Sequence, residues 1–226
     1  MAAVPERASV ERPLPWRLVT VDIDGTLTRT HGWKEMAVAF DRLDAFQETN
    51  RRFFAHEIGE DPHLTDLLDL VTGHTVAEVL AVVERTPKLR RIREGVVQLH
   101  DLGARAALLT HNPSYVVDWY RNTYGFDDAE GVNAQAVEGG RIGPPVGVHA
   151  DKSGGLRALL ARERVVPSAV AHVGDGWSDA EVFRQVGGGV ALNSPLVEVN
   201  RAADLALTTE EFPDVVAALA RLAPRP

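Results

Sequence analysis

Short apolar runs alternate with segments of helical spacing along most of this chain. Residues 17–23 (RLVTVDI) are β-branched and apolar, a pattern typical of a short buried strand. Later apolar runs predict further strands at 105–110, 169–174, 189–192 and 204–207. Helical patterns lie between and after them, near 93–101, 113–123, 152–164 and 178–186, from Pro195, and over 210–222. Strands that alternate with helices predict an α/β fold on a doubly wound parallel sheet.

The segment between the first two predicted strands follows a different pattern. From 29 to 90 the spacing is helical and no convincing strand is present. Apolar residues three and four positions apart predict one helix over 33–55. Asp61 is the expected N-cap of a second helix, and Thr75 with Glu78 predicts a capping box at the start of a third.

These patterns divide the chain into an arm, a core and an insertion. We expect a helical cap domain at 29–90, inserted into a core formed by 17–28 and 91–226. Residues 1–16 carry charges and prolines without an apolar signal core, so we expect a loose N-terminal arm. The stretch EGGRIGPPVG (138–147) predicts turns or a hairpin.

Composition and charge narrow the possible partners. The 226 residues include no cysteine, which excludes disulfides, thiolate metal sites and a cysteine nucleophile. A net charge of −8 argues against nucleic-acid or anionic-membrane partners, which call for a basic face. No apolar run approaches the roughly 20 residues of a membrane span. We predict a cytoplasmic protein, a monomer or homodimer, that binds a small molecule.

Polar residues gather at the predicted strand ends. Ligands of parallel sheets bind beyond the carboxyl ends of the strands. There the sequence places, or brings close, Asp22, Asp24, Thr110, Lys152, Asp175 and Asp179.

The acidic residues of this set can be interpreted in two ways. Asp22 and Asp24 could simply cap a solvated strand end, which is common in any βα turn. The second acidic cluster, GDGWSD at 174–179, favours a functional site over a simple strand end. Three or four converging carboxylates repel one another unless a cation lies among them, and oxygen ligands without cysteine indicate a hard ion, most simply Mg²⁺.

Thr110 and Lys152 are each more often structural than functional when taken alone. Together they would supply a hydroxyl and a cation on the same rim as the metal. Such a set suits a phosphoryl group, whose transition state spreads charge over three oxygens.

The order of four motifs resembles the haloacid dehalogenase superfamily of phosphatases. The motifs are DIDGTLT, LLTHN, the lysine of DKSGG and VGDGWSD, and they span residues 22–179. The helical insertion is similar to the cap of the phosphoserine phosphatase-like branch, and NAQAVEGGRIG resembles the hairpin that this branch has before its lysine. The resemblance implies a Rossmann-like core and an Mg²⁺-dependent hydrolase of a small phosphate ester.

The resemblance also implies a role for each motif residue. Asp22 would be the nucleophile that forms an aspartyl-phosphate, and Asp24 would protonate the leaving oxygen and then deprotonate water. Mg²⁺ would be bound by the Asp22 side chain, the Asp24 backbone carbonyl and Asp175. The remaining roles are phosphate binding by Thr110 and Lys152, and orientation of Lys152 or a metal-bound water by Asp179.

Departures from the branch bear on the substrate. The second motif reads Thr110-His111-Asn112 where Ser-Gly-Gly is usual, Ser178 replaces the usual asparagine, and no glutamate follows the first motif to bind an ammonium group. We therefore predict that phosphoserine is a poor substrate. We expect His31 and Arg51, with Arg52 nearby, to bind an ester that bears hydroxyl or anionic groups. Trp177 could contact substrate or cap, or shield the metal.

Two other functions stay open on the sequence. A phosphotransferase or mutase would pass the phosphoryl group to a hydroxyl other than water. A catalytically silent binding module is the alternative from another class, although it has no need of the repelling pair Asp22 and Asp24.

Overall fold

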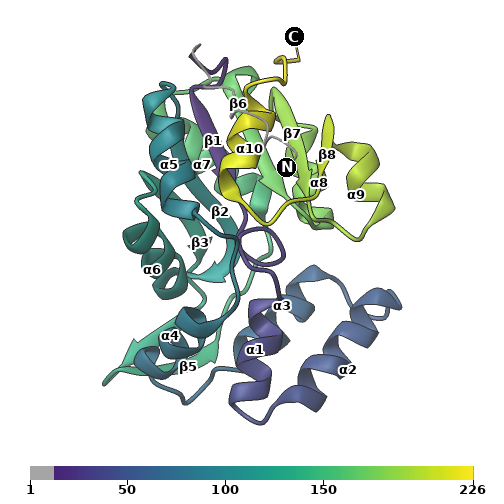
Figure 1. Ribbon diagram of the computed structural model, residues 1–226. Coiled ribbons are helices and arrows are strands. Elements are labelled where there is room, and N and C mark those ends of the chain that lie inside the picture. The colour runs from purple at the N-terminus through teal and green to yellow at the C-terminus, as the bar shows by residue number, and fades with distance from the viewer. Residues whose placement is uncertain (1–12, 226) are drawn as a thin grey trace, which may run out of the picture.

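A six-stranded parallel sheet forms the centre of the core (Figure 1). The computed structural model describes residues 13–225. The strand order is β3-β2-β1-β6-β7-β8, and every neighbouring pair is parallel. The strands are β1 (Leu18–Val21), β2 (Arg105–Pro113), β3 (Asp128–Val132), β6 (Val170–Gly174), β7 (Gly188–Leu192) and β8 (Leu205–Leu207). The predicted doubly wound parallel sheet is confirmed.

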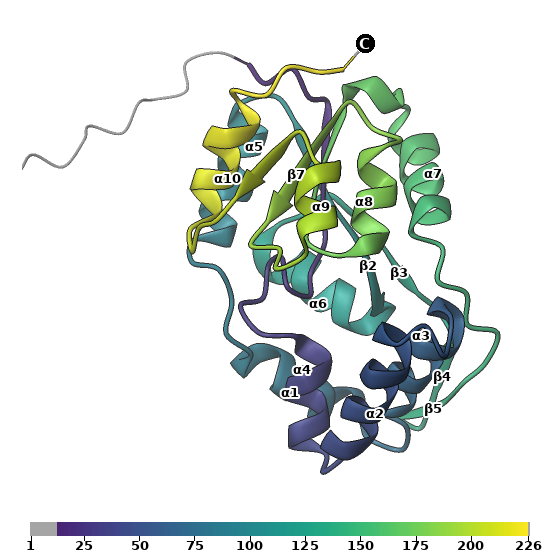
Figure 2. The same ribbon diagram turned by 90° about the vertical axis from the view of Figure 1, so that its right-hand side faces the viewer.

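Helices cover both faces of this sheet (Figure 2). All four residues of β1 are buried, and they alternate between two apolar clusters, with Leu18 in one and Val19 and Val21 in the other. The first cluster includes residues of α7 (Lys152–Glu163) and α8 (Trp177–Phe183). The second includes residues of α5 (Ile92–Asp101), α6 (Ser114–Tyr124) and α10 (Phe212–Leu219). The short elements α9 (Val197–Ala202) and η1 (Pro167–Ala169) complete the core.

The strand order creates the place where a ligand can bind. The chain runs outward from β1 to β2 and β3, and then returns to the other side of β1 as β6. Val21, the last residue of β1, pairs with Leu108 on one side and Val173 on the other. The residues that follow these three positions therefore lie together at a topological switch point, beyond the carboxyl ends of the strands.

Four helices form the cap at that end of the sheet, namely α1 (Gly32–Ala39), α2 (Leu43–Phe54), α3 (Glu60–Asp69) and α4 (Val76–Arg85) (Figure 1). The predicted single helix over 33–55 is wrong, because the chain breaks between α1 and α2. Asp41 there has a φ of 56°, a left-handed conformation that ends a helix and that aspartate tolerates better than most residues.

The two predicted helix starts in the cap have different outcomes. The Thr75–Glu78 capping box is confirmed at the start of α4. Asp61 is not an N-cap, because α3 begins at Glu60 with Gly59 as its cap. The Asp61 carboxylate instead accepts a hydrogen bond from the Ala150 amide at 2.8 Å, which ties the cap to the loop before α7.

The predicted hairpin forms from β4 (Gln135–Glu138) and β5 (Arg141–Pro145). Although it belongs to the segment assigned to the core, it packs on the cap. The Gly73 amide donates to the Ile142 carbonyl at 2.8 Å, and Gln135 Nε2 donates to the Leu68 carbonyl at 3.0 Å. The second excursion of the chain thus completes the cap.

The start of the described chain corrects the predicted arm. Residues 1–12 lie outside the described residues, but Leu14 and Trp16 are part of the core rather than a loose arm. The Trp16 indole donates to the Leu219 carbonyl at 2.9 Å, and its ring is 1% exposed. Burial of this large ring anchors the chain directly before β1.

Candidate active site

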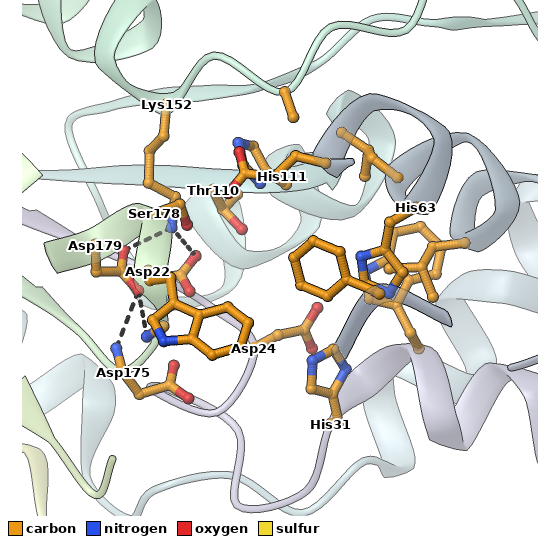
Figure 3. A pocket seen from close by; sticks show the side chains of 18 of the residues that line it. Asp22, Asp24, His31, His63, Thr110, His111, Lys152, Asp175, Ser178 and Asp179 are labelled. Carbon is orange, nitrogen blue, oxygen red and sulfur yellow. Dashed lines mark hydrogen bonds and ion pairs between the residues drawn. The ribbon is translucent and has the colours of Figure 1, made fainter. Parts of the chain in front are cut away.

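A cavity of about 290 Å³ lies between the carboxyl ends of the strands and the cap. It is lined by most of the predicted site residues: Asp22, Asp24, His31, Thr110, Lys152, Asp175 and Asp179 (Figure 3). Asp24 lies between the cluster around Asp22 on one side and the cap histidines His31 and His63 on the other (Figure 3). The cavity therefore has a charged end on the core and an opposite wall on the cap.

A tight turn after β1 brings the two acidic motifs into contact. The amides of Leu27 and Thr28 both donate to the Ile23 carbonyl, and Gly25 has a φ of 77°. A Cβ at Gly25 would lie 2.2 Å from Asp175 Oδ2, so only glycine permits this approach. The turn also aims the Thr26 hydroxyl, which donates to Asp175 Oδ1 at 2.9 Å.

Asp179 is held by four hydrogen bonds and is almost fully buried. Its Oδ1 accepts from Lys152 Nζ at 2.6 Å and from His172 Nε2 at 2.8 Å. Its Oδ2 accepts from the amides of Asp175 and Gly176, at 3.0 and 2.8 Å. Burial alone would raise the pKa of Asp179, but the Lys152 ammonium and the His172 hydrogen bond outweigh it and hold the pKa below its ordinary value.

Lys152 links Asp179 to the predicted nucleophile. Its Nζ lies 3.3 Å from Asp22 Oδ1, and the side chain is 4% exposed. Burial alone would lower the pKa of Lys152, but Asp179 and Asp22 raise it above its ordinary value, so the group stays an ammonium. Its place at the start of α7 follows from the preceding residue, Asp151, which caps the helix through the Gly154 amide at 2.6 Å.

The carboxyl groups of Asp22 and Asp175 resist ionisation. Burial raises the pKa of Asp22 to about 7, and the charges of Asp179 and Asp24 add to this while Lys152 opposes it. Burial, with the charges of Asp179 and Asp22, also raises the pKa of Asp175 well above its ordinary value. A positive charge placed between Asp22 and Asp175 would stabilise both carboxylates.

The acidic cluster therefore fits a cation. Carboxylate oxygens of Asp22, Asp175 and Asp179 lie within 4.8 Å of one another. Because Asp179 uses both of its oxygens for protein donors, Asp22 and Asp175 are the side chains left to bind an ion. This all-oxygen donor set suits a hard divalent cation.

Asp24 joins the cap to the end of β2. Its Oδ1 accepts from the Gly32 amide at 2.7 Å, and its Oδ2 accepts from Asn112 Nδ2 at 2.9 Å. A Cβ at Gly32 would lie 2.4 Å from Oδ1, so glycine is required at the first position of α1 for this contact. The sequence marks Asn112 as a departure from the second motif, but it does not predict the contact of Asn112 with Asp24.

The end of β2 is organised around Thr110, which is 5% exposed. Its hydroxyl oxygen accepts from the amide and the side-chain Nδ2 of Asn112, at 3.3 and 3.2 Å. His111 between them lines the cavity, and burial lowers its pKa to about 4, so its imidazole is neutral at physiological pH.

A buried pair on neighbouring strands supports the cluster from behind. Thr20 and His172 are register partners on β1 and β6, and both are 0% exposed. His172 Nε2 contacts the Asp179 carboxylate, which can only accept, so Nε2 carries the hydrogen. The Thr20 hydroxyl then donates to Nδ1 at 2.8 Å. Polar residues inside otherwise apolar strands were the sequence signal that could have found this pair.

Arg51 does not reach the cavity. Its guanidinium is exposed and bonds to Glu48 at 2.9 Å and to Glu57 at 2.8 Å. The structure therefore does not bring Arg51 to the cavity lining, and it gives the prediction that Arg51 binds substrate no support. Trp177, in contrast, lines the cavity and contacts the cap residues Phe53 and Phe54.

The protein has a capped α/β fold with a lysine–carboxylate cluster at the switch point of its parallel sheet. The sequence model of the haloacid dehalogenase-like hydrolases matches residues 16–187, and the chain belongs to this family. The predicted resemblance is confirmed. Within the described residues, none of the helices has both the length and the apolar character needed to cross a bilayer.

Similar proteins agree with this assignment. A phosphoserine phosphatase from Archaeoglobus fulgidus is 26% identical over 181 residues, which cover 79% of this chain and 53% of that protein. The chain thus spans about half the length of this curated relative. A HAD family hydrolase from Salmonella enterica serovar Typhi superposes with a TM-score of 0.83 at 16% identity, covering 94% of this chain and 73% of the other. A phospho-aspartyl intermediate analogue of phosphoserine phosphatase superposes with a TM-score of 0.76 at 16% identity, covering 90% and 98%.

Proposed function

We propose that this protein is an Mg²⁺-dependent phosphomonoester hydrolase that acts on a small phosphate ester through an aspartyl-phosphate on Asp22. One observation carries the proposal. The Asp22 carboxylate lies 3.3 Å from a buried ammonium, that of Lys152, and lines the same cavity as Asp24, whose two oxygens are held by separate donors. A nucleophile, an acid–base group and a fixed cation are the parts that this reaction needs.

The reaction follows from these positions. Asp22 attacks phosphorus, the ester P–O bond breaks, and Asp24 protonates the departing alcohol oxygen. Asp24 then takes a proton from a water molecule that attacks the phosphorus of the aspartyl-phosphate, which releases phosphate and restores both carboxyl groups. Lys152 and Thr110 bind phosphoryl oxygens throughout, and Asp179 keeps Lys152 in place.

Asp22, Asp175 and the backbone carbonyl of Asp24 would bind Mg²⁺, which would neutralise charge on the phosphoryl oxygens. Lys152 and Thr110 would hold the phosphoryl end of the ester at the core side of the cavity. His31, which lies on the cap side of the cavity (Figure 3), would then face the alcohol part of the ester.

A panel of phosphomonoesters, assayed for phosphate release with and without Mg²⁺, tests the proposal. We expect release that stops in EDTA and returns with Mg²⁺. Phosphate release without any acceptor alcohol separates a hydrolase from a phosphotransferase. Metal-independent turnover, or no turnover of any ester, would refute the proposal. A cytoplasmic location and a monomeric or homodimeric state stay predictions from composition.

A further inference from the structure

Apolar side chains, rather than charged ones, form most of the cap side of the cavity. Trp33, Leu64 and Leu67 are 2%, 3% and 5% exposed and form its inner part. Further apolar side chains continue the wall, namely Phe53 and Phe54 of the cap and Trp177, Pro195 and Leu196 of the core. A wall of this kind binds a ligand by removing apolar surface from water.

The same wall offers no cation to a second anionic group. Among the described residues that line the cavity, Lys152 is the only lysine or arginine, and it is already paired with Asp22 and Asp179. Arg51 is paired with two glutamates outside the cavity. A carboxylate on the substrate would lose its water here without gaining a lysine or arginine partner, which is costly. The expected preference for anionic groups is therefore not supported.

Aromatic rings gather where cap and core meet. Phe54 is 57% exposed, and its ring centroid lies 5.5 Å from that of Trp177 in an edge arrangement. Phe53 lies 5.8 Å from Trp177 and stacks on His63 at 4.2 Å with an interplanar angle of 4°. An exposed phenylalanine beside a cavity indicates a binding surface when it belongs to a continuous apolar patch.

The polar side chains on the cap side of the cavity are His31, Asn50, Glu60 and His63, and those of His31 and Glu60 are exposed. His63 Nε2 hydrogen-bonds with Asn50 Oδ1 at 3.0 Å, and burial lowers the pKa of His63 to about 4, so this ring is neutral. Glu60 is exposed in the first turn of α3, and partial burial with the nearby charges of Glu181 and Asp61 raises the pKa of its carboxyl group above the ordinary value. The interior of the wall thus calls for a neutral, apolar group.

We propose that the preferred substrate is a phosphomonoester of a small neutral alcohol with one apolar ring, and that the ring packs against Phe53, Phe54 and Trp177. This inference rests on the proposed function and names its substrate class. The volume of about 290 Å³ lies at the lower end of the range for small-molecule sites, roughly 300–1,000 Å³, which limits the alcohol to about one ring.

Three primary alkyl esters with Mg²⁺ test the substrate class: 2-phenylethyl phosphate, ethyl phosphate and O-phosphoserine. Ethyl phosphate lacks the ring, and phosphoserine carries a carboxylate. We expect kcat/KM for the phenylethyl ester to exceed both others by about tenfold to a hundredfold, the range that burial of one apolar side group supports.

Phe54→Ala locates the ring contact. We expect it to lower kcat/KM for 2-phenylethyl phosphate by about tenfold and to leave the value for ethyl phosphate nearly unchanged, with Phe54→Leu intermediate. Val38→Ala is the matched control, because Val38 is a 56% exposed apolar residue of the cap outside the cavity lining. Equal losses on both esters would mean that Phe54 closes the cap on the core, and would overturn the proposed contact.

The failure of this inference is distinguishable from failure of the proposed function. If no ester is hydrolysed, the phosphatase assignment fails. If ethyl phosphate is hydrolysed but phosphoserine, or phosphocholine added as a cationic ester, exceeds the phenylethyl ester, the phosphatase assignment stands and the substrate class is wrong. Equal rates for ethyl and phenylethyl phosphate would contradict it as well.

Discussion

The side chains at the two ends of the cavity are fixed by different interactions: hydrogen bonds and ion pairs at the core end, and apolar contacts at the cap end. At the core end, Lys152 and Asp179 are 4% and 1% exposed, and each is bound by groups from several strands and helices. At the cap end, Phe54 is more than half exposed, and its ring contacts those of Phe53 and Trp177. Directional bonds in a buried setting fix atoms closely, whereas apolar contacts tolerate substitution and movement.

Because of this difference, we expect the core end to carry out the reaction and the cap end to select the substrate. The core end presents the groups that a phosphoryl transfer needs, at positions set by strand register. The cap end offers surface that favours one kind of alcohol over another, and binding energy from that remote part can lower the barrier at phosphorus. Variants at the core end should therefore affect every ester alike, while variants at the cap end should change the ranking of esters.

Asp22→Asn should have the largest effect. The substitution keeps the shape of the side chain but removes the nucleophile, so turnover should be abolished for every ester. This loss should exceed that in Asp24→Asn, where removal of the acid–base group should lower kcat by a factor of about 10² to 10⁴. The fold should persist, since a buried carboxyl with a pKa raised to about 7 is replaced by a neutral amide. Phosphate release and thermal melting measure both effects, and an active Asp22→Asn protein would rule out the proposed nucleophile.

Cation binding should depend strongly on pH. Below the raised pKa values of Asp22 and Asp175, protons must leave before a cation binds, so affinity should rise with pH, by up to about tenfold per unit for each proton released. The increase should be steepest below about 7, the pKa of Asp22, and flatten as Asp22 becomes ionised. Calorimetric titration with Mg²⁺ at pH 6 and 8, in buffers of different ionisation enthalpy, counts the protons. Equal affinity at both pH values would contradict the proposed ligands.

Gly32→Ala tests whether Asp24 depends on its contact with the cap. The new Cβ would lie 2.4 Å from Asp24 Oδ1 and displace it, so kcat should fall by about tenfold to a hundredfold for all esters. Gly59→Ala is the matched control, because nothing lies within 4 Å of a Cβ there. If the two variants behave alike, the Gly32–Asp24 contact does not position the acid–base group.

His172→Ala should have a smaller effect on catalysis. It removes one donor from Asp179 and leaves the Thr20 hydroxyl with only the Ala171 carbonyl, at 3.4 Å, as an acceptor, so stability should fall by about 1–3 kcal/mol. Lys152 would be held less firmly, and kcat should fall by about tenfold with KM nearly unchanged. Thr20→Val should cost less, because His172 can still donate to Asp179. A stability loss with unchanged kcat would assign the pair a purely structural role.

Arg51→Ala should have the smallest effect. Because Arg51 lies outside the cavity and pairs only with exposed glutamates, kcat/KM should stay unchanged for esters with and without a ring. His31→Ala, at the cavity wall, should in contrast change the ranking of esters. A selective loss in Arg51→Ala would show that the cap rearranges when substrate binds.

Several features of the site could be predicted from local sequence. Each strand that carries a polar end was found by its apolar run, and Thr75–Glu78 was found because a capping box is a local motif. The break at Asp41 was missed because the helical spacing of apolar residues continues across it. Arg51 was misplaced because spacing along a helix does not reveal which face meets the active site.

The alternation of strands and helices and the motif order from Asp22 to Asp179 can be read from the local sequence, and they are enough to identify the family. Which side chains contact one another depends on the folded arrangement of the whole chain. Asp24 and Asn112 are 88 positions apart, and Thr20 and His172 are 152 apart. Such pairs depend on strand order and register, which are set by packing across the whole sheet, whereas periodicity and capping act within a few residues.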